Sequence, residues 1–412
     1  MSRRVVVIGA GIVGVSSAIW LMRSGVQVTI VDRLGPGQGT SHGNAGILAS
    51  VAMVPVTGPG LIAKSPGMLM SDKFPLFMRW SYLPRLLPWL MGYLSNANDA
   101  DTRRIAKGLT PITSDSVEQH KSLAQDLQLD HWITSSDYNF AYKSRADFDA
   151  EAYTWALRRE AGFEPRFIEG QDLRDYEPNL SHDNQFMASL KNHGYIKDPG
   201  GYVAALAQAF EQAGGTIIKA DVKDFELTDG VVTSVETDQG SLPCDDVVLA
   251  AGVWSKPMMA KLGVKVPLES ERGYHIVFEG ATGGPTRPTM IASGKFVATP
   301  MAQGLRCAGV VEFGGLDAGP SKAPLAFIRT HAKAAFPQLQ AKSEVEWLGH
   351  RPAPTDSLPL IGQIGTSRVF AAFGHQHIGL TGGPKTGRLV AGLITDQPTN
   401  IDMSAYHPQR FT

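Results

Sequence analysis

Residues 5–14 read VVVIGAGIVG, an apolar strand that runs directly into the glycine pattern G-x-G-x-x-G. A second apolar strand, VTIVD, ends in Asp32, which lies 18 positions beyond Gly14 (32 − 14 = 18). In this pattern Gly9 permits a tight turn, Gly11 lets the backbone approach a pyrophosphate, and Gly14 lets the helix pack closely on the strand. The helix N-terminus offers free N–H groups and a positive dipole to phosphates, and the acid is placed to bind a ribose. The unit therefore predicts a dinucleotide site, the alternative being a structural βαβ unit with incidental glycines.

Length, charge and cysteine content exclude several kinds of protein. With 412 residues the chain is long enough for two domains with large cores. It carries 38 Lys and Arg against 39 Asp and Glu, a net charge of −1, so no basic field favours nucleic acid. Cys244 and Cys307 lack metal or redox spacing, which indicates a reducing compartment without structural disulfides.

From the sequence we expect neither a signal for export nor a membrane-spanning segment. It opens on the first strand, so we expect no signal peptide, and no apolar stretch reaches the ~18 residues that span a bilayer. Residues 74–94 read FPLFMRWSYLPRLLPWLMGYL, where three prolines and two arginines argue against a spanning helix. This segment fits a helical hairpin over a functional site, a patch on a membrane surface, or core packing. We expect a cytoplasmic protein, at most peripheral on the inner face of the cell membrane through this segment.

A second glycine-rich turn follows an apolar strand near the end of the chain. The strand VFAAF at 369–373 leads into GHQHIGLTGGP, and a helix then runs to about Ile394, with Pro384 suited to its first turn. A nicotinamide-dependent dehydrogenase has no obvious need for this turn, whereas the isoalloxazine ring of a flavin, far from its adenosine, needs a second cradle. A helix N-terminus there would stabilise negative charge on the reduced ring.

Together these pieces resemble the D-amino-acid oxidase-like superfamily of FAD-dependent amine oxidoreductases, and within it the bacterial D-amino acid dehydrogenases of small-subunit type. The resemblance runs nearly end to end. Besides the first glycines and Asp32, it rests on SHGNAG at 41–46, AAGVWS at 250–255, RP at 351–352, DSLPLIG at 356–362, and the stretch from GH at 374–375 through GR at 387–388.

The resemblance implies a mixed α/β (α+β) fold with two interleaved domains. A Rossmann-like FAD-binding domain would comprise residues 1–73, 146–164, 199–260 and 346–412. A substrate-binding domain would comprise 74–145, 165–198 and 261–345; the alternation of apolar and polar residues over 264–315 independently predicts a largely antiparallel sheet there.

The resemblance also implies that FAD is bound without a covalent link. Sarcosine-oxidase relatives attach FAD through a cysteine near the position of His350, and this chain has none there. The implied cofactor contacts are Gly9, Gly11, Ile12, Val13, Gly14, Asp32, Arg33, Ser41, His42, Asn44, Ala45, Gly46, Ile47, Val222, Ala251, Gly252, Trp254, Gly379, Leu380 and Thr381.

Three residues are candidates for the catalytic site. Arg351 matches the arginine that grips the substrate carboxylate in related amine oxidases, since its fork meets both carboxylate oxygens; the alternative is an ion pair at a domain seam. Tyr274 is a candidate for a second contact to the carboxylate or amine, with core packing as its alternative. His377 is expected in the same pocket, together with His275 and His375. No carboxylate or cysteine spacing accompanies these histidines, so we expect no metal.

The implied activity is oxidative deamination of a D-amino acid, by hydride transfer from Cα to flavin N5, with electrons passed to a quinone or another acceptor. The small Leu380, where the family often has a bulkier aromatic residue, and the polar His377 suggest a cyclic substrate such as a D-proline derivative. Three alternatives stay open: a sarcosine- or glycine-type amine oxidase using O2, a flavin-dependent 2-hydroxy-acid dehydrogenase, and a non-catalytic FAD-binding scaffold.

Overall fold

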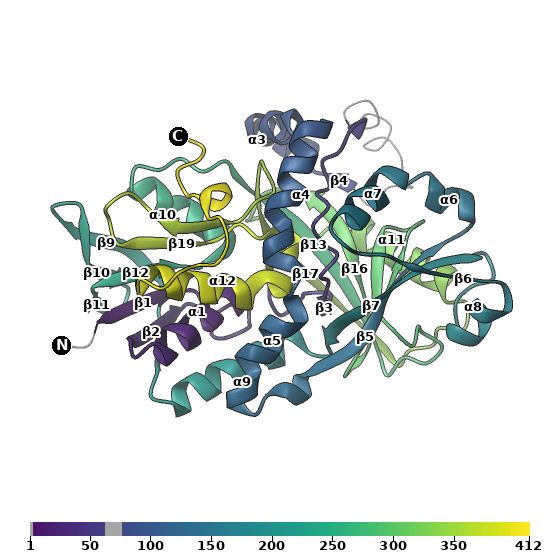
Figure 1. Ribbon diagram of the computed structural model, residues 1–412, viewed down its shortest axis with the longest axis horizontal. Helices are drawn as coiled ribbons and strands as arrows, with labels where there is room; N and C mark the ends of the chain where they lie inside the picture. Colours follow the sequence, from purple (N-terminus) through teal and green to yellow (C-terminus); the bar gives the residue numbers. More distant parts are fainter. Residues whose placement is uncertain (1–2, 62–75) are drawn as a thin grey trace.

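The computed structural model describes residues 3–61 and 76–412, which are organised by two large sheets lying side by side (Figure 1). In the described residues the first sheet has six strands in the order β18-β19-β12-β1-β2-β8. The parallel strands are β1 (Arg4–Ile8), β2 (Gln27–Asp32), β8 (Thr216–Lys219), β12 (Asp246–Leu249) and β19 (Val369–Phe373). The antiparallel β18 (Leu360–Gln363) closes one edge. Their central strands are rich in buried Val, Ile and Ala, as expected for a sheet covered on both faces.

Helices cover this sheet and bring the two glycine turns together. They are α1 (Ile12–Arg23), α4 (Asp99–Thr113), α5 (Ser116–Ala124), α9 (Pro199–Gln212), α10 (Ser255–Lys261) and α12 (Gly379–Ile394). Helices α1 and α12 pack closely because glycines face the neighbouring backbone: a Cβ on Gly387 would lie 2.6 Å from the carbonyl carbon of Ser16. The two predicted turns, almost 370 residues apart, therefore open at the same edge of the sheet (Figure 1).

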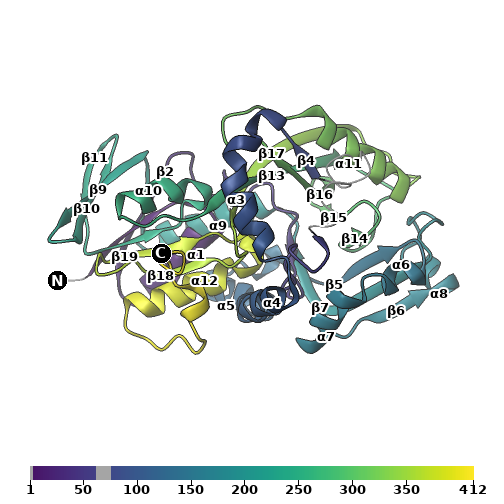
Figure 2. The same ribbon diagram turned by 90° about the horizontal axis from the view of Figure 1, so that it is seen from above.

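A small antiparallel sheet and a larger one complete the fold. The small sheet joins β9 (Val222–Thr228), β10 (Val231–Thr237) and β11 (Gly240–Pro243). The described residues also form a ten-stranded sheet, seen from above in Figure 2. Its strands are β3 (Ile47–Leu48), β4 (Leu76–Met78), β5 (Ile133–Tyr142), β6 (Arg166–Glu169), β7 (Phe186–Ile196), β13 (Leu268–Glu279), β14 (Thr289–Ile291), β15 (Phe296–Met301), β16 (Gly304–Phe313) and β17 (Ser343–Pro354).

The ten-stranded sheet is mostly antiparallel, as the alternation over 264–315 predicts. Among the described strand pairs of this ten-stranded sheet, only β14–β5 and β16–β4 run parallel. The helices α6 (Arg145–Asp149), α7 (Ala152–Glu160), α8 (Gly170–Tyr176) and α11 (Lys322–Ala335) accompany it.

The structure groups three parts of the predicted domain division differently. The boundary at 345/346 cuts through β17, which pairs with β13 along its whole length. Residues 146–164 pack on the ten-stranded sheet, where Phe148 meets Phe186 and Trp155 meets Phe140. Conversely, α4 and α5, placed with the substrate domain, pack against α12. An amphipathic pattern shows that a helix packs on something, but not on which sheet.

The segment 74–94, described from residue 76, folds as β4, a 3₁₀ turn over Trp80–Tyr82 and α3 (Leu83–Ser95). The inner side of α3 buries Trp89, whose Nε1 donates to the carbonyl of Ala353 at 2.9 Å. On the outer side Trp80 and Met91 are 60% and 65% exposed. No helix in the described ranges is long and apolar enough to cross a bilayer. The helix thus covers the end of β17 with one face and presents apolar side chains with the other.

Candidate functional site

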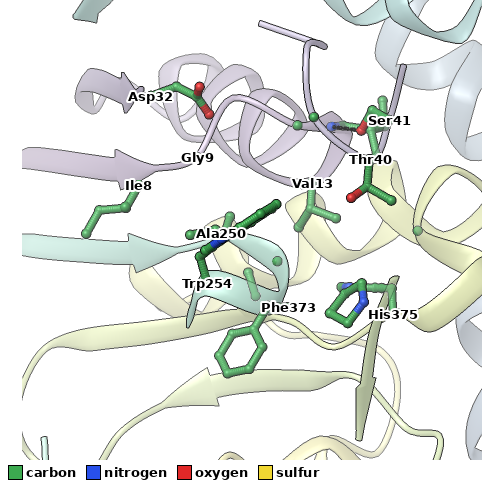
Figure 3. Close-up of a pocket in the computed structure, with 18 of the residues that line it drawn as sticks. Ile8, Gly9, Val13, Asp32, Thr40, Ser41, Ala250, Trp254, Phe373 and His375 are labelled. Atoms are coloured by element: carbon green, nitrogen blue, oxygen red, sulfur yellow. Dashed lines mark hydrogen bonds between the residues drawn. The ribbon is translucent and has the colours of Figure 1, made fainter. Parts of the chain in front are cut away.

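A cavity lies where the carboxyl ends of β1, β2, β12 and β19 meet the starts of α1 and α12. This edge is where open parallel sheets bind ligands, because the helix N-termini point there. Figure 3 shows Asp32 and His375 at opposite ends of the view, with Gly9, Val13 and Ala250 between them. The cavity therefore extends from the first glycine turn to the second.

The first turn has no room for side chains at two of its glycines. Gly9 has φ +108°, and a Cβ there would lie 2.5 Å from the carbonyl oxygen of Ala250. A Cβ on Gly14 would overlap the carbonyl oxygen of Gly9. The tight turn and the close helix–strand packing that the pattern predicts are both present, and Gly11 lines the cavity beside Ile12.

Asp32 binds the backbone of the turn. Its Oδ2 accepts from the N–H of Ala10 at 2.8 Å, and its Oδ1 accepts from Leu34 and Gly35 at 2.8 and 2.9 Å. The carboxylate lines the cavity, so its role toward a ribose stays a prediction that this geometry permits. The guanidinium of the neighbouring Arg33 lies 4.2 Å from the centre of the Trp254 ring, at the same end of the cavity.

The 41–47 segment passes between the two sheets and is held by both. Ser41 Oγ accepts from the N–H of Ile12 at 3.0 Å, which uses one of the first-turn donors that have no partner inside the helix. From the other side, Arg306 donates to the carbonyls of His42 and Asn44 at 3.0 and 2.6 Å. These bonds fix the segment against the open side of the first turn.

The second turn is fixed through its carbonyls. His120 Nε2 lies 2.8 Å from the carbonyl oxygen of Leu380, and Ser116 Oγ donates to the carbonyl of Thr381 at 2.8 Å. Burial lowers the pKa of His120 to about 4, so it is neutral at pH 7. Gly379 and Leu380 line the cavity at the N-terminus of α12, where backbone N–H groups and the helix dipole favour negative charge.

These features fit FAD, the cofactor expected from the sequence. Two helix N-termini open on one elongated cavity, glycine positions that cannot hold a Cβ bring the backbone close to it, and its walls are largely apolar. The thiols of Cys244 and Cys307 are buried in the cores, and burial raises the pKa of Cys244 to about 12. A non-covalent link remains a prediction. In the described chain no three His, Cys, Asp or Glu side chains converge on a metal position.

Beside the second turn, Arg351 and His377 come together. Arg351 lies on β17 with its guanidinium over Gly273 of β13; a Cβ on that glycine would lie 2.6 Å from Arg351 Cζ. The guanidinium donates to the carbonyl of Val310 at 3.3 Å and makes no ion pair within the described ranges, which disfavours the structural alternative. His377 is exposed, yet desolvation and then the charge of Arg351 lower its pKa to about 4. The charge of Arg351 acts on His377, so the two side chains lie near each other beside Pro352 and Gln376, which line the cavity.

Tyr274 lies on the opposite face of β13. Its hydroxyl donates to Glu312 Oε2 at 2.6 Å and accepts from the N–H of Ser321 at 3.0 Å, and the residue is buried. Side chains alternate along a strand, so Tyr274 points away from the face on which Gly273 meets Arg351. The structure does not bring Tyr274 to Arg351 and His377, and its alternative, core packing, matches the geometry. His275 shares the face of Gly273 but binds the carbonyl of Gly43 through Nδ1 at 3.0 Å.

Most of the predicted cofactor residues line the cavity. These are Gly9, Gly11, Ile12, Val13, Asp32, Arg33, Ser41, Asn44, Val222, Ala251, Gly252, Trp254, Gly379 and Leu380. The others, Gly14, His42, Ala45, Gly46, Ile47 and Thr381, are outside its lining and shape the backbone behind it.

Sequence reasoning missed several lining residues, chiefly at strand ends. The lining also includes Ile8, Val31, Leu34, Gly39, Thr40, Ala220, Asp221, Ala250, Pro257, Met258, Pro352, Ala372, Phe373, Gly374, His375 and Gln376, of which His375 was an expected pocket residue. A usable signal existed, because the last residues of parallel strands lie at the ligand-binding edge.

Comparison with known proteins agrees with this geometry. Residues 4–393 match the family model described as DAO, FAD dependent oxidoreductase. The chain is 38% identical to a D-amino-acid oxidase and 27% identical to a D-amino acid dehydrogenase, both of Bradyrhizobium diazoefficiens, over 99% of this chain and 99% of each relative. Its fold matches glycine oxidase of Geobacillus kaustophilus with a TM-score of 0.75 at 19% identity, covering 99% of both chains. The chain therefore belongs to the DAO family of FAD-dependent oxidoreductases.

Proposed function

We propose that this chain oxidises a D-amino acid at Cα, giving an imino acid that water hydrolyses to a keto acid and ammonia. A cyclic amine such as a D-proline derivative would keep its nitrogen in the ring. The observation that carries the proposal is Arg351, a cationic fork over Gly273, next in sequence to the cavity-lining Pro352 and without an ion-pair partner in the described chain. The names of the two Bradyrhizobium relatives support amino-acid oxidation, and the D configuration rests on those names alone.

In this proposal the protein's residues bind and orient the substrate. Two parallel N–H bonds from Arg351 to the carboxylate would fix the position of Cα, and Gly273 leaves room for the fork. His377, with a pKa of about 4, adds no positive charge near neutral pH that would repel the amine. Trp89 and Tyr93 on the inner side of α3 help exclude water from this end of the sheet. FAD, when bound, supplies the acceptor for the hydride that leaves Cα.

A flavin-bleaching screen tests the proposal. Purified protein is mixed without oxygen with D- and L-amino acids, cyclic imino acids, N-methylglycines and 2-hydroxy acids, and loss of the oxidised flavin absorption is followed. We expect bleaching by D-amino acids or D-configured ring amines. Bleaching by hydroxy acids alone or by L-amino acids alone would contradict the proposal, and an inert flavin would favour the scaffold alternative.

We also propose that a quinone takes the electrons at a membrane surface. The supporting observation is an exposed apolar surface formed by Leu87 and Met91 of α3, beside Arg85, and by Trp80 of the preceding 3₁₀ turn. Flotation with anionic liposomes, comparing the wild type with a Trp80→Ser/Met91→Ser variant, tests the contact. Loss of flotation in the variant supports it, and a wild-type protein that stays at the bottom of the gradient rejects it.

A second candidate acceptor is O2, because the 38% identical relative is named an oxidase. Reoxidation of the bleached flavin by air and by a soluble quinone analogue separates the two. Fast reoxidation by the quinone and slow reoxidation by air would support a dehydrogenase, and the reverse would support an amine oxidase.

A further inference from the structure

Glu271 stands apart from the other buried acids of the described chain. It is 6% exposed and has no hydrogen bond or ion pair with any described residue. Every other buried carboxylate described has at least one such partner; these are Glu177, Glu269, Glu312, Asp246 and Asp356. Buried polar groups are nearly always paired, because an unpaired one loses its hydration without compensation. Among the described residues, Glu271 is therefore a buried acid without a protein partner.

The position of Glu271 places it opposite the proposed carboxylate-binding arginine. In the pairing of β13 with β17, Glu271 is the direct cross-strand neighbour of Arg351, so both side chains leave the same face of the sheet. Their charged atoms are not within 4.0 Å of each other, since no ion pair joins them. The carboxylate oxygens of Glu271 have no described partner, yet neither is fully buried. Part of the 6% exposed surface of Glu271 therefore belongs to its carboxylate. One face thus presents a cation and an anion side by side, neither of which forms an ion pair with a described residue.

We propose that Glu271 binds the substrate's α-ammonium group and removes one proton from it before Cα is oxidised. This inference rests on the proposed function and names a catalytic residue for it. An α-amino acid carries its carboxylate and ammonium on a single carbon, so the ligand matches the Arg351–Glu271 pair charge for charge. In the proton step an N–H bond breaks and an O–H bond forms on Glu271. The freed nitrogen lone pair then forms the C=N bond as the hydride leaves Cα for the FAD.

The charges around Glu271 suit a proton acceptor. Burial raises its pKa, and Arg351, from the neighbouring strand, opposes that rise. From α3, the phenol of Tyr93 faces it, and burial together with Glu271 raises the pKa of that phenol, which therefore stays neutral. His377, beside Arg351, has a pKa of about 4 and is neutral near pH 7. A carboxylate with a raised pKa is a stronger base than one in water.

The same pair would select amines over hydroxy acids. A 2-hydroxy acid satisfies Arg351 but carries no positive charge, so it leaves Glu271 buried without a counter-charge. Glu271, rather than Arg351, therefore disfavours the alternative that the protein is a 2-hydroxy-acid dehydrogenase. This difference gives the inference a test that needs no turnover.

The first experiment measures binding with two ligands that cannot be oxidised. 2-Aminoisobutyrate has no hydrogen on Cα, and isobutyrate has the same skeleton without the amine. Binding to the flavin-loaded protein is followed by calorimetry, in the wild type, in Glu271→Gln and in the control Glu269→Gln. Glu269 lies on the same face, and an amide can still accept from Tyr82. We expect Glu271→Gln to weaken 2-aminoisobutyrate by about 10-fold or more and to leave isobutyrate unchanged or tighter. An equal effect on both ligands, or none, would overturn the inference.

The second experiment follows the pH dependence of flavin reduction by a substrate found in the screen. In the wild type, kcat/KM should rise with pH as Glu271 loses its proton. In Glu271→Gln that limb should shift to the higher pH at which the free substrate amine is neutral, with a loss of about 10²-fold or more near pH 7. Glu269→Gln should keep the wild-type profile. If amines bleach both Glu271→Gln and the wild type with one profile, the inference fails and the proposed function stands. If no amine bleaches the wild type, the proposed function fails first.

Discussion

The charged residues on the two faces of β13 differ in whether they form ion pairs. On one face Arg272 forms an ion pair with Glu312 at 3.2 Å and lies 3.3 Å from the hydroxyl of Tyr274, which also binds Glu312. On the other face Arg351 of β17 and Glu271 are cross-strand neighbours, and neither has an ion-pair partner among the described residues. The two arrangements lie within a few residues of each other on the same strand.

The difference separates charges that hold the fold from charges available to a ligand. Burying a charged side chain costs free energy unless an opposite charge or hydrogen bonds compensate it. Two buried charges that do not form an ion pair therefore lower the stability of the fold. A site that binds a charged ligand keeps its charges positioned before binding, which avoids reorganisation when the ligand arrives. We therefore expect substitutions on the closed face to change unfolding, and substitutions on the open face to change binding.

The largest expected effect is on the closed face. Arg272→Met removes the buried cation but keeps much of the side-chain volume, so Glu312 stays buried with only the partly exposed Arg79, at 3.7 Å, as a cationic partner. We expect the free energy of unfolding to fall by about 3–5 kcal/mol, measured by urea denaturation of the flavin-loaded protein. The KM of the remaining folded enzyme should be close to that of the wild type. A raised KM with unchanged stability would reverse the assignment of the two faces.

On the open face, Arg351→Ala should leave stability nearly unchanged and damage substrate binding. Because the variant loses both N–H bonds to the carboxylate, kcat/KM should fall by about 10²–10³-fold, mainly through KM, while the flavin absorption of the purified protein persists. Arg351→Lys keeps the charge without the fork and should recover only part of the loss. Wild-type steady-state kinetics in Arg351→Ala would remove Arg351 from the site.

Acid should destabilise the protein partly by protonating the buried His120. The pKa of His120 is about 4 in the folded chain against 6.5 as its ordinary value, so its stabilising contribution is complete above pH 6.5 and is lost as the pH falls toward 4. Between pH 7 and pH 4.5 this loss amounts to about 2 kcal/mol in the free energy of unfolding. His120→Gln should remove that share of the pH dependence. An unchanged pH dependence in His120→Gln would contradict a buried, neutral His120 in the folded chain.

The sequence was most informative where the reason for a residue is local. Gly9 and Gly14 were predicted from their spacing because the clash that excludes a side chain arises within one turn and its neighbouring strand. The second turn at Gly379 was also recognised, since a strand, glycines and a helix lie within about 25 residues.

Contacts between distant segments were less predictable. Alternation along β13 separates Tyr274 from Gly273, but only the pairing with β17 shows which of the two faces Arg351. Glu271 was not predicted as a site residue for the same reason: the sequence around it does not reveal the pairing of β13 with β17, which places it opposite Arg351, 80 positions away. The contacts of 146–164 were hard to predict for a related reason, because its aromatic residues pack on strands that no local pattern identifies.

The smallest expected effect concerns the glycine that makes room for Arg351. In Gly273→Ala the new methyl group would lie 2.6 Å from Arg351 Cζ, so the guanidinium must shift by part of an ångström. Because misplacing a binding group weakens the oriented complex more than it weakens the fold, we expect KM to rise by about 10-fold with stability nearly unchanged. Gly319→Ala, where nothing lies within 4 Å of the added atom, is the matched control and should keep the wild-type KM. Equal KM values for the two variants would show that the position of the fork over Gly273 is not the position that binds substrate.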